Sequence, residues 1–246
     1  LGWRPWLPRV AWLRLLRRLP RVVVASPAMA DELALNGVPR EHLVVLPPVP
    51  ATPLPASPPA YRRGGRLLFV GQVLRTKGWD LLLDAYERLS DPPPLTIAGA
   101  GNDLEPLRAR LEASGLSERV ETPGWLDADG LAERYADASL VVVPSRWQEP
   151  FGLVGLEAMS WARPVVAFAV GGIPSWLDHG RTGLLASPED SAALAHAMEA
   201  LLADPARAEA MGKAGFQVRR TRFDFERSLI RLERALRLQT PQEVRA

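Results

Sequence analysis

The sequence predicts an α/β protein built on a doubly wound parallel sheet, and three observations favour this class. Short apolar runs rich in Val, Leu and Ile recur between residues 66 and 185, as is typical of strands buried on both faces. Segments of helical periodicity follow these runs, with glycine or proline at most junctions. Such an alternation of strand and helix favours parallel strands joined by right-handed crossovers.

Composition narrows the function classes. The chain has 246 residues, enough for one large domain or one domain with appendages. Its formal net charge of +2 gives no argument for nucleic-acid binding. It has no cysteine, which excludes disulfides and thiolate metal sites and favours a cytoplasmic location. We expect neither a membrane-spanning helix nor a secretory signal, because the sequence lacks apolar runs of the needed length.

The first 46 residues predict a helix and a small strand–helix–strand segment. Over residues 10–19 the arginines lie largely away from an apolar face, which predicts a basic amphipathic helix. Two interpretations stay open: an ordinary domain helix with a solvated side, or a helix on an anionic surface at the inner face of a membrane. A strand over 22–25, a helix over 27–36 and a strand over 43–46 follow. The apolar face comprises Trp12, Leu15, Leu16 and Leu19.

A proline-rich segment divides this part from the main domain. Residues 47–65 predict a semi-rigid linker, residues 66–220 the α/β domain, and residues 221–246 a C-terminal helix and tail. The expected strands are 66–70, 95–98, 119–122, 139–143, 164–168 and about 183–185. The expected helices are 79–90, 103–114, 129–136, 152–162, 190–202, 205–220 and 224–238.

Two carboxylates frame the loop that follows the apolar strand at 139–143. Glu149 lies in the loop and Glu157 about two turns into the next helix, so both could face one ligand at the carboxyl end of the strand. Carboxylates suit paired sugar hydroxyls, and free backbone N–H groups at a helix start suit a diphosphate. The alternative is that Glu149 caps the helix and Glu157 lies on a solvated face. The N–H groups concerned belong to Phe151, Gly152, Leu153 and Val154.

Residues 144–159 read Pro-Ser-Arg-Trp-Gln-Glu-Pro-Phe-Gly-Leu-Val-Gly-Leu-Glu-Ala-Met. This segment resembles the signature of the retaining glycosyltransferases of family 4, or group 1, in the GT-B class. The resemblance implies a Rossmann-like domain that is one half of a GT-B fold and binds a nucleotide-diphosphate sugar. It also implies transfer with retention of configuration and without a metal or other cofactor. It assigns the hydroxyls of the transferred sugar to Glu149 and the ribose to Glu157.

A second segment, Phe69–Gly78, ends one strand and opens the next helix. Gly71 allows the backbone to approach a phosphate closely, and the Lys77 ammonium can stabilise the negative charge that develops on a departing diphosphate. The alternative is a plain glycine turn with a solvated lysine. The segment resembles the family's phosphate loop, in which Arg follows the glycine and Lys comes five residues later. Here Gln72 stands at the Arg position, so we expect weaker donor binding unless Arg75 substitutes.

Gly99 lies in a glycine turn that we expect to form the cleft floor, because the third glycine and the acid of a dinucleotide fingerprint are missing at the needed spacing. Two further loops resemble parts of the family's donor site. In the first, Trp125 and Leu126 are the candidates for contact with the nucleobase, and packing of Trp125 in the core or at the rim is the alternative. Ser175 stands where the family commonly has Glu. We expect no metal site, because the histidines lack ligand spacing. They are His42, His179 and His196.

Together these features predict the donor-binding half of a glycosyltransferase with Lys77 and Glu149 as catalytic residues. Residues 22–46 resemble the end of the family's first domain, so we expect the acceptor-binding domain to be missing and the chain to be inactive alone. It would then be a fragment or one subunit of a split enzyme. Two alternatives stay open: sugar phosphorylase or epimerase chemistry on a related frame, and a non-catalytic domain that binds a nucleotide or a partner protein.

Overall fold

The computed structural model describes residues 6–51 and 54–237, which form two compact units. One unit contains the described residues up to Val49 together with those from Phe223, and the other spans Pro50–Arg222. The predicted α/β domain at 66–220 falls within the second unit. The predicted linker is divided between the units, and the predicted C-terminal helix belongs with the N-terminal segment. Parts of the predicted N-terminal segment, linker and tail, at 1–5, 52–53 and 238–246, lie outside the described residues.

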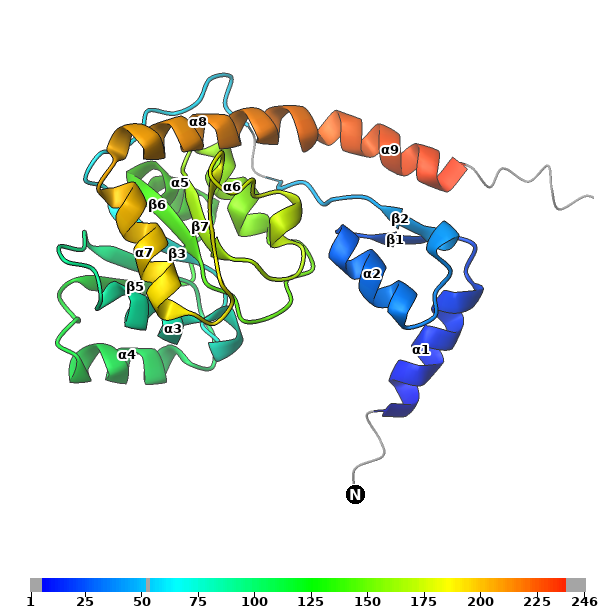
Figure 1. Ribbon diagram of the computed structural model, residues 1–246, viewed down its shortest axis with the longest axis horizontal. Helices are drawn as coiled ribbons and strands as arrows, with labels where there is room; N and C mark the ends of the chain where they lie inside the picture. The colour runs from blue at the N-terminus through cyan, green and yellow to red at the C-terminus, as the bar shows by residue number, and fades with distance from the viewer. Residues whose placement is uncertain (1–5, 52–53, 238–246) are drawn as a thin grey trace, which may run out of the picture. The chain divides into compact units, whose positions relative to one another are not determined.

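The larger unit is built on a six-stranded sheet whose strands are all parallel, in the order β5-β4-β3-β6-β7-β8 (Figure 1). The chain winds outward from β3 in one direction and outward from β6 in the other, which confirms the predicted doubly wound sheet. The switch point therefore lies between β3 and β6. The strands are β3 (Arg66–Val70), β4 (Leu95–Ala98), β5 (Val120–Gly124), β6 (Ala138–Val143), β7 (Val165–Phe168) and β8 (Gly183–Ala186).

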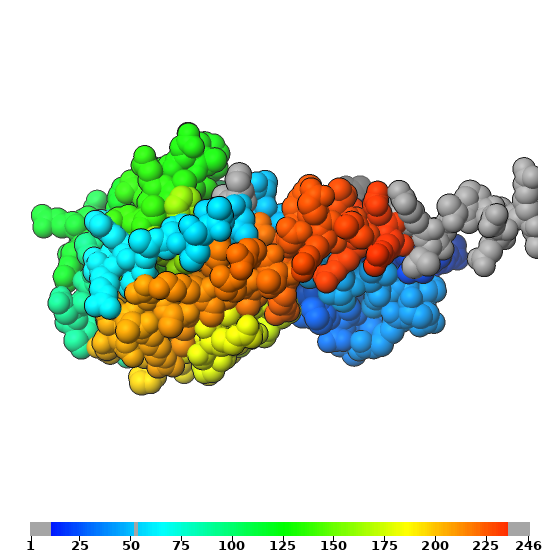
Figure 2. All heavy atoms as spheres, turned by 90° about the horizontal axis from the view of Figure 1, so that it is seen from above, coloured from blue at the N-terminus to red at the C-terminus, as the bar shows by residue number. Residues whose placement is uncertain are grey.

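Helices cover both faces of this sheet. Right-handed crossovers that run in opposite directions from the switch point place their helices on opposite faces. Accordingly α3 packs against α7, whereas α6 packs against α8, which forms one outer face of the unit (orange in Figure 2). The helices are η2 (Arg75–Lys77), α3 (Trp79–Tyr86), α4 (Leu104–Ala113), α5 (Ala128–Asp137), α6 (Leu153–Ser160), η3 (Ile173–Ser175), α7 (Ser191–Leu202) and α8 (Pro205–Arg222).

The core lies on both sides of the central strands. Leu67, Ile97, Val141 and Val166 are fully buried, as the continuous apolar runs predict for strands covered on two faces. Arg163 is also buried, and its guanidinium donates to the carbonyl oxygens of three residues at 2.8 to 2.9 Å. These hydrogen bonds offset the cost of removing the charge from water. The acceptors belong to Ala60, Tyr135 and Ala136.

The smaller unit contains a parallel pair, β1 (Val22–Val24) and β2 (Leu43–Val45). Val22, Val24, Ala30 and Val38 form its buried core. Ser26 caps α2 by accepting the Met29 N–H at 3.3 Å, as the Ser-Pro start predicts. The remaining elements are α1 (Trp6–Arg18), α2 (Pro27–Leu35), η1 (Arg40–His42) and α9 (Phe225–Arg237).

Helix α1 matches the predicted amphipathic segment only in part. Leu16 packs against the core of the smaller unit, whereas Trp12, Leu15 and Leu19 stay exposed. The apolar face is therefore divided between a buried and an exposed side. None of the helices in the described ranges combines the length and apolar character needed to cross a bilayer.

Candidate functional site

The loops that follow β3 and β6 meet at the switch point of the sheet. Backbone hydrogen bonds join them, because the Thr76 carbonyl accepts the N–H groups of Arg146 and Trp147, each at 3.0 Å. The Lys77 ammonium contacts Glu149 Oε1 at 2.6 Å. The lysine side chain is 28% exposed and that of Glu149 10%, so this ion pair is largely shielded from water. The structure thus brings together the two predicted catalytic residues.

Glycines permit the close approach of these loops. Gly78 has φ 75°, and a Cβ there would lie 1.8 Å from the Pro144 carbonyl oxygen. Gly171 has φ 52°, and a Cβ there would lie 2.3 Å from the Glu149 carbonyl oxygen. That same oxygen accepts the Gly172 N–H at 2.7 Å. The backbone of Glu149 is therefore fixed by the loop after β7, while its side chain turns to Lys77.

Helix α6 begins beside Glu149 without a side-chain cap. Its N-cap is Gly152, whose φ of 92° suits glycine best, and the N–H groups of Leu153 and Val154 have no acceptor within the helix. Phe151 differs from expectation, because it precedes the N-cap and its side chain is buried. Its carbonyl accepts the Trp176 indole N–H at 2.6 Å. Phe151 therefore anchors the turn and does not belong to the first helical turn.

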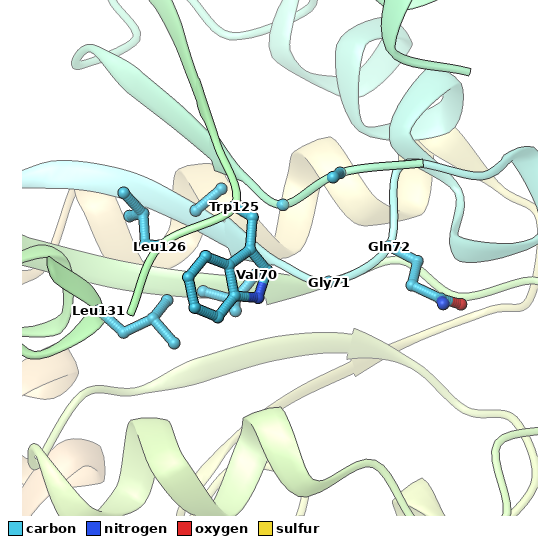
Figure 3. Close-up of a pocket in the computed structure, with 9 residues that line it drawn as sticks. Val70, Gly71, Gln72, Trp125, Leu126 and Leu131 are labelled. Carbon is cyan, nitrogen blue, oxygen red and sulfur yellow. The ribbon is translucent and has the colours of Figure 1, made fainter. Parts of the chain in front are cut away.

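A pocket of about 440 Å³ opens at the carboxyl ends of β3, β4 and β5 (Figure 3). In this view the Trp125 ring lies between Leu126 and Gly71, and Gln72 extends at the far end. Gly99, predicted as the cleft floor, lines this pocket; a Cβ there would lie 1.8 Å from the Gly71 carbonyl oxygen. The complete lining is Val70, Gly71, Gln72, Ala98, Gly99, Ala100, Trp125, Leu126 and Leu131.

A second pocket of about 440 Å³ shares Trp125, Leu126 and Leu131 with the first, so the two adjoin. Glu157 and Tyr135 line the second pocket, and the Tyr135 hydroxyl donates to Glu157 Oε2 at 2.9 Å. Burial raises the pKa of Tyr135 well above its usual value, and the adjacent Glu157 carboxylate raises it further. The phenol therefore stays protonated and acts as a hydrogen-bond donor.

Arg75, a candidate donor-binding residue, and Ser175, which stands where the family commonly has Glu, lie outside both pockets. The Arg75 guanidinium contacts Asp80 Oδ2 at 3.3 Å, its side chain is 73% exposed, and it lines neither pocket. That Arg75 supplies the charge missing at Gln72 therefore stays a prediction. Ser175 donates its hydroxyl to the Gly172 carbonyl at 2.6 Å, which supports the loop that holds Glu149.

The structure adds residues to the site that no sequence motif indicates. Tyr135 comes from α5 and touches Glu157, and Trp176 holds Phe151. Arg146 donates to both oxygens of Asp80 at 2.9 Å and so secures the loop before Glu149. Of these three residues, Arg146 alone lies within the segment 144–159 that resembles the family signature.

The fold and site together define a doubly wound α/β domain whose loops gather at the switch point of a parallel sheet, where open α/β sheets bind ligands. The chain belongs to the family described as glycosyl transferases group 1, whose model matches residues 55–218. This match confirms the family resemblance of residues 144–159. The matched range includes the two loops that carry Lys77 and Glu149, and all lining residues of both pockets except Ala51.

Among curated proteins, a D-inositol 3-phosphate glycosyltransferase of Arthrobacter sp. (strain FB24) is 35% identical over 222 residues, covering 82% of this chain and 52% of that protein. A glycogen synthase of Mycobacterium tuberculosis is 32% identical over 222 residues, covering 88% of this chain and 53% of that protein. The chain therefore spans about half the length of these relatives.

Solved structures confirm the fold. A sucrose-phosphate synthase from Thermosynechococcus elongatus aligns with a TM-score of 0.82 at 28% identity, over 93% of this chain and 60% of that one. Anabaena HepE in complex with UDP and glucose aligns with a TM-score of 0.81 at 22% identity, over 93% of this chain and 66% of that one.

Proposed function

We propose that this chain binds the nucleotide-diphosphate sugar donor of a retaining, metal-independent glycosyltransferase. The observation that carries the proposal is the contact between Lys77 and Glu149 at the switch point, with Glu157 lining the pocket beside the same helix. An ammonium group has three donors, so Lys77 can keep its bond to Glu149 while it donates to a diphosphate oxygen. A cation and an acid would then act on neighbouring parts of one ligand.

The chemistry follows from where charge develops. Negative charge builds on the diphosphate as its bond to the sugar breaks, and Lys77 together with the first-turn N–H groups of α6 stabilises it. Glu149 accepts hydrogen bonds from the sugar hydroxyls, and its bond to Lys77 holds it in a positioning role rather than a nucleophilic one. Departure and attack on the same face of the sugar would retain its configuration. These groups supply the positive charge without a metal ion.

The adjoining pockets suit the nucleotide half of the donor. We assign the ribose to Glu157, the nucleobase to the surface formed by Trp125 and Leu126, and the phosphates to the backbone near Gly71 and Gln72. Anabaena HepE, which shares the fold, has been solved in complex with UDP and glucose. Two adjoining pockets suit an extended ligand of this kind, which has one apolar end and one charged end.

The acceptor would bind to a further domain or a partner subunit. In the described part of the smaller unit the sheet has two strands, which are parallel, and Val23 and Val45 are 43% and 41% exposed. Parallel strands are normally covered on both faces, and a two-stranded sheet is marginally stable alone. We therefore infer that other residues cover this unit in the working enzyme, and that this chain alone binds the donor without transferring the sugar.

The location forms part of the same proposal. The lack of cysteine favours a reducing compartment, and we infer a cytoplasmic one. The exposed Trp12, Leu15 and Leu19 on the arginine-rich helix α1 support peripheral contact with an anionic membrane surface. Flotation with vesicles of anionic and of neutral lipid tests this contact. We expect binding to the anionic vesicles alone, and loss of binding when Trp12 is changed to Glu.

Donor binding is tested by isothermal calorimetry of the full chain with UDP, GDP, ADP and their glucose conjugates. We expect one base class to bind, and Lys77→Ala and Glu157→Ala each to weaken that binding by about tenfold or more. Glu118→Ala, a change at an exposed glutamate outside both pockets, serves as the matched control and leaves affinity unchanged. Failure of every nucleotide to bind the unaltered chain would contradict the proposal.

A further inference from the structure

Tyr135 is a buried residue that also lines the second pocket. The residue is only 2% exposed, yet its hydroxyl reaches Glu157 Oε2 at 2.9 Å. Both residues line the same pocket, and Glu157 is the only carboxylate of that lining placed on α6. The bond joins the end of α5 to the second turn of α6. Neither element alone therefore determines how the Glu157 carboxylate is turned.

The backbone of Tyr135 is held as firmly as its hydroxyl. The buried Arg163 donates to the Tyr135 carbonyl at 2.8 Å and to the Ala136 carbonyl at 2.9 Å, which satisfies the end of α5. The Arg163 backbone N–H donates to the Ala158 carbonyl at 2.9 Å, directly after Glu157. One residue thus ties the end of α5 to α6, and the distance between the phenol and the carboxylate is fixed by this bridge.

We propose that Tyr135 is the positioning residue that orients Glu157 for recognition of a vicinal diol, and so sets the preference for ribose over deoxyribose. This inference rests on the proposed function, because Glu157 must face the ribose. A carboxylate offers about four acceptor positions, and the phenol takes one of them on Oε2. Oε1 is left with both lone pairs for the paired hydroxyls, while rotation of the carboxylate is restricted. Preorganisation of this kind lowers the entropy cost of binding.

The test compares ribose with deoxyribose in the full chain. Calorimetry would measure UDP, GDP and ADP and their 2′-deoxy and 3′-deoxy counterparts. We expect the unaltered chain to prefer the ribose form, Glu157→Ala to abolish the preference, and Tyr135→Phe to lower it about fivefold with little effect on the deoxy forms. Tyr86→Phe is the matched control: it removes another buried hydroxyl, which donates to the Pro93 carbonyl at 2.9 Å, and leaves the preference unchanged.

The outcomes separate the two proposals. An unaltered chain that binds no nucleotide, or binds deoxy forms equally well, overturns the ribose assignment and this inference with it. A chain that prefers ribose while Tyr135→Phe keeps or increases that preference overturns the positioning role alone. If the preference is kept, Tyr135→Phe would resemble Tyr86→Phe, with a lower unfolding temperature and unchanged discrimination.

A second measurement tests the role of Tyr135 in the unaltered chain and does not require Tyr135→Phe to fold. The chain contains three tyrosines, Tyr61, Tyr86 and Tyr135, so biosynthetic labelling with 3-fluorotyrosine gives a ¹⁹F NMR spectrum of few lines. We expect the Tyr135 line to shift with the ribose nucleotide and to respond less to its deoxy counterpart. Tyr61→Phe and Tyr86→Phe assign the other two lines. An equal response of the Tyr135 line to both ligands would count against the inference.

Discussion

Removal of the Lys77 ammonium should destabilise the larger unit, because Glu149 would be left nearly buried without its partner. We expect Lys77→Met to lower the free energy of unfolding by about 2 kcal/mol. Breaking a fully buried pair costs about 3–5 kcal/mol and an exposed pair about 0–1, and this pair lies between them at 28% and 10% exposure. A loss of that size lowers the unfolding temperature by about 5 °C in a unit of this length.

The double variant separates loss of the partner from loss of packing. Lys77→Met combined with Glu149→Gln removes both charges, so we expect most of the lost stability to return. The matched control is Lys213→Met, because Lys213 is the chain's other lysine and its bond to Glu209, at 2.7 Å, lies on an exposed helix surface. We expect no measurable change there.

Urea denaturation followed by circular dichroism and tryptophan fluorescence gives the free energies of unfolding, provided that the two curves coincide. Calorimetry with the nucleotide that binds the unaltered chain should show weakened binding in the double variant despite its recovered stability. The reasoning is refuted if Lys77→Met is as mild as Lys213→Met, or if the second charge removal deepens the loss.

Three further changes test other parts of the structure. Gln72→Arg should increase affinity for a nucleoside diphosphate about tenfold at low salt, with a smaller gain for the monophosphate; equal affinities before and after the change would contradict a phosphate contact. Arg163→Lys keeps the charge but cannot reach three carbonyls, so urea denaturation should show a loss of about 2–3 kcal/mol. The raised pKa of Tyr135 means that the folded state keeps a proton that the unfolded state loses above about pH 10, so stability falls as pH rises there. Tyr135→Phe should flatten this alkaline decline more than Tyr86→Phe does, and parallel curves for both variants would argue against it.

The strands of the larger unit could be predicted because each is buried on both faces. A continuous apolar run marks such a strand without reference to its neighbours, and β6 begins one residue earlier than predicted. The predicted end of a strand or helix was wrong where hydrogen bonds with another segment determine it. Strand β5 extends to Gly124 because β4 pairs with it beyond a register shift, with Ala98 opposite Gly124. Helix α3 ends at Tyr86, short of the predicted residue 90, and i→i+3 hydrogen bonds tighten the turn to Leu89.

The grouping of the chain into units could not be predicted from local patterns. The periodicity of residues 224–238 indicates an apolar face but not what that face meets. In the structure α9 lines a pocket of about 210 Å³ together with Leu46–Val49, so the C-terminal helix belongs with the N-terminal segment. A contact between residues some 180 positions apart carries no sequence-local signal, and an amphipathic helix is compatible with either unit.

In the site too, some residues can be recognised from sequence motifs, whereas others are placed there by the packing of the helices. Lys77 and Glu149 lie in recognisable loops, and they meet because those loops leave two strands that are neighbours only at the switch point. Arg75 carries the right charge in the right loop, but Asp80 on the following helix takes its guanidinium. Tyr135 gives no signal at all, since a tyrosine on the apolar side of a helix is typical of an ordinary core residue. Its hydroxyl reaches Glu157 on α6, and the hydrogen bonds of Arg163 join the same two helices. Sequence motifs therefore identify candidate site residues that lie in loops, whereas a side chain such as Tyr135, which meets the site through Glu157, is found only from the packing of the helices.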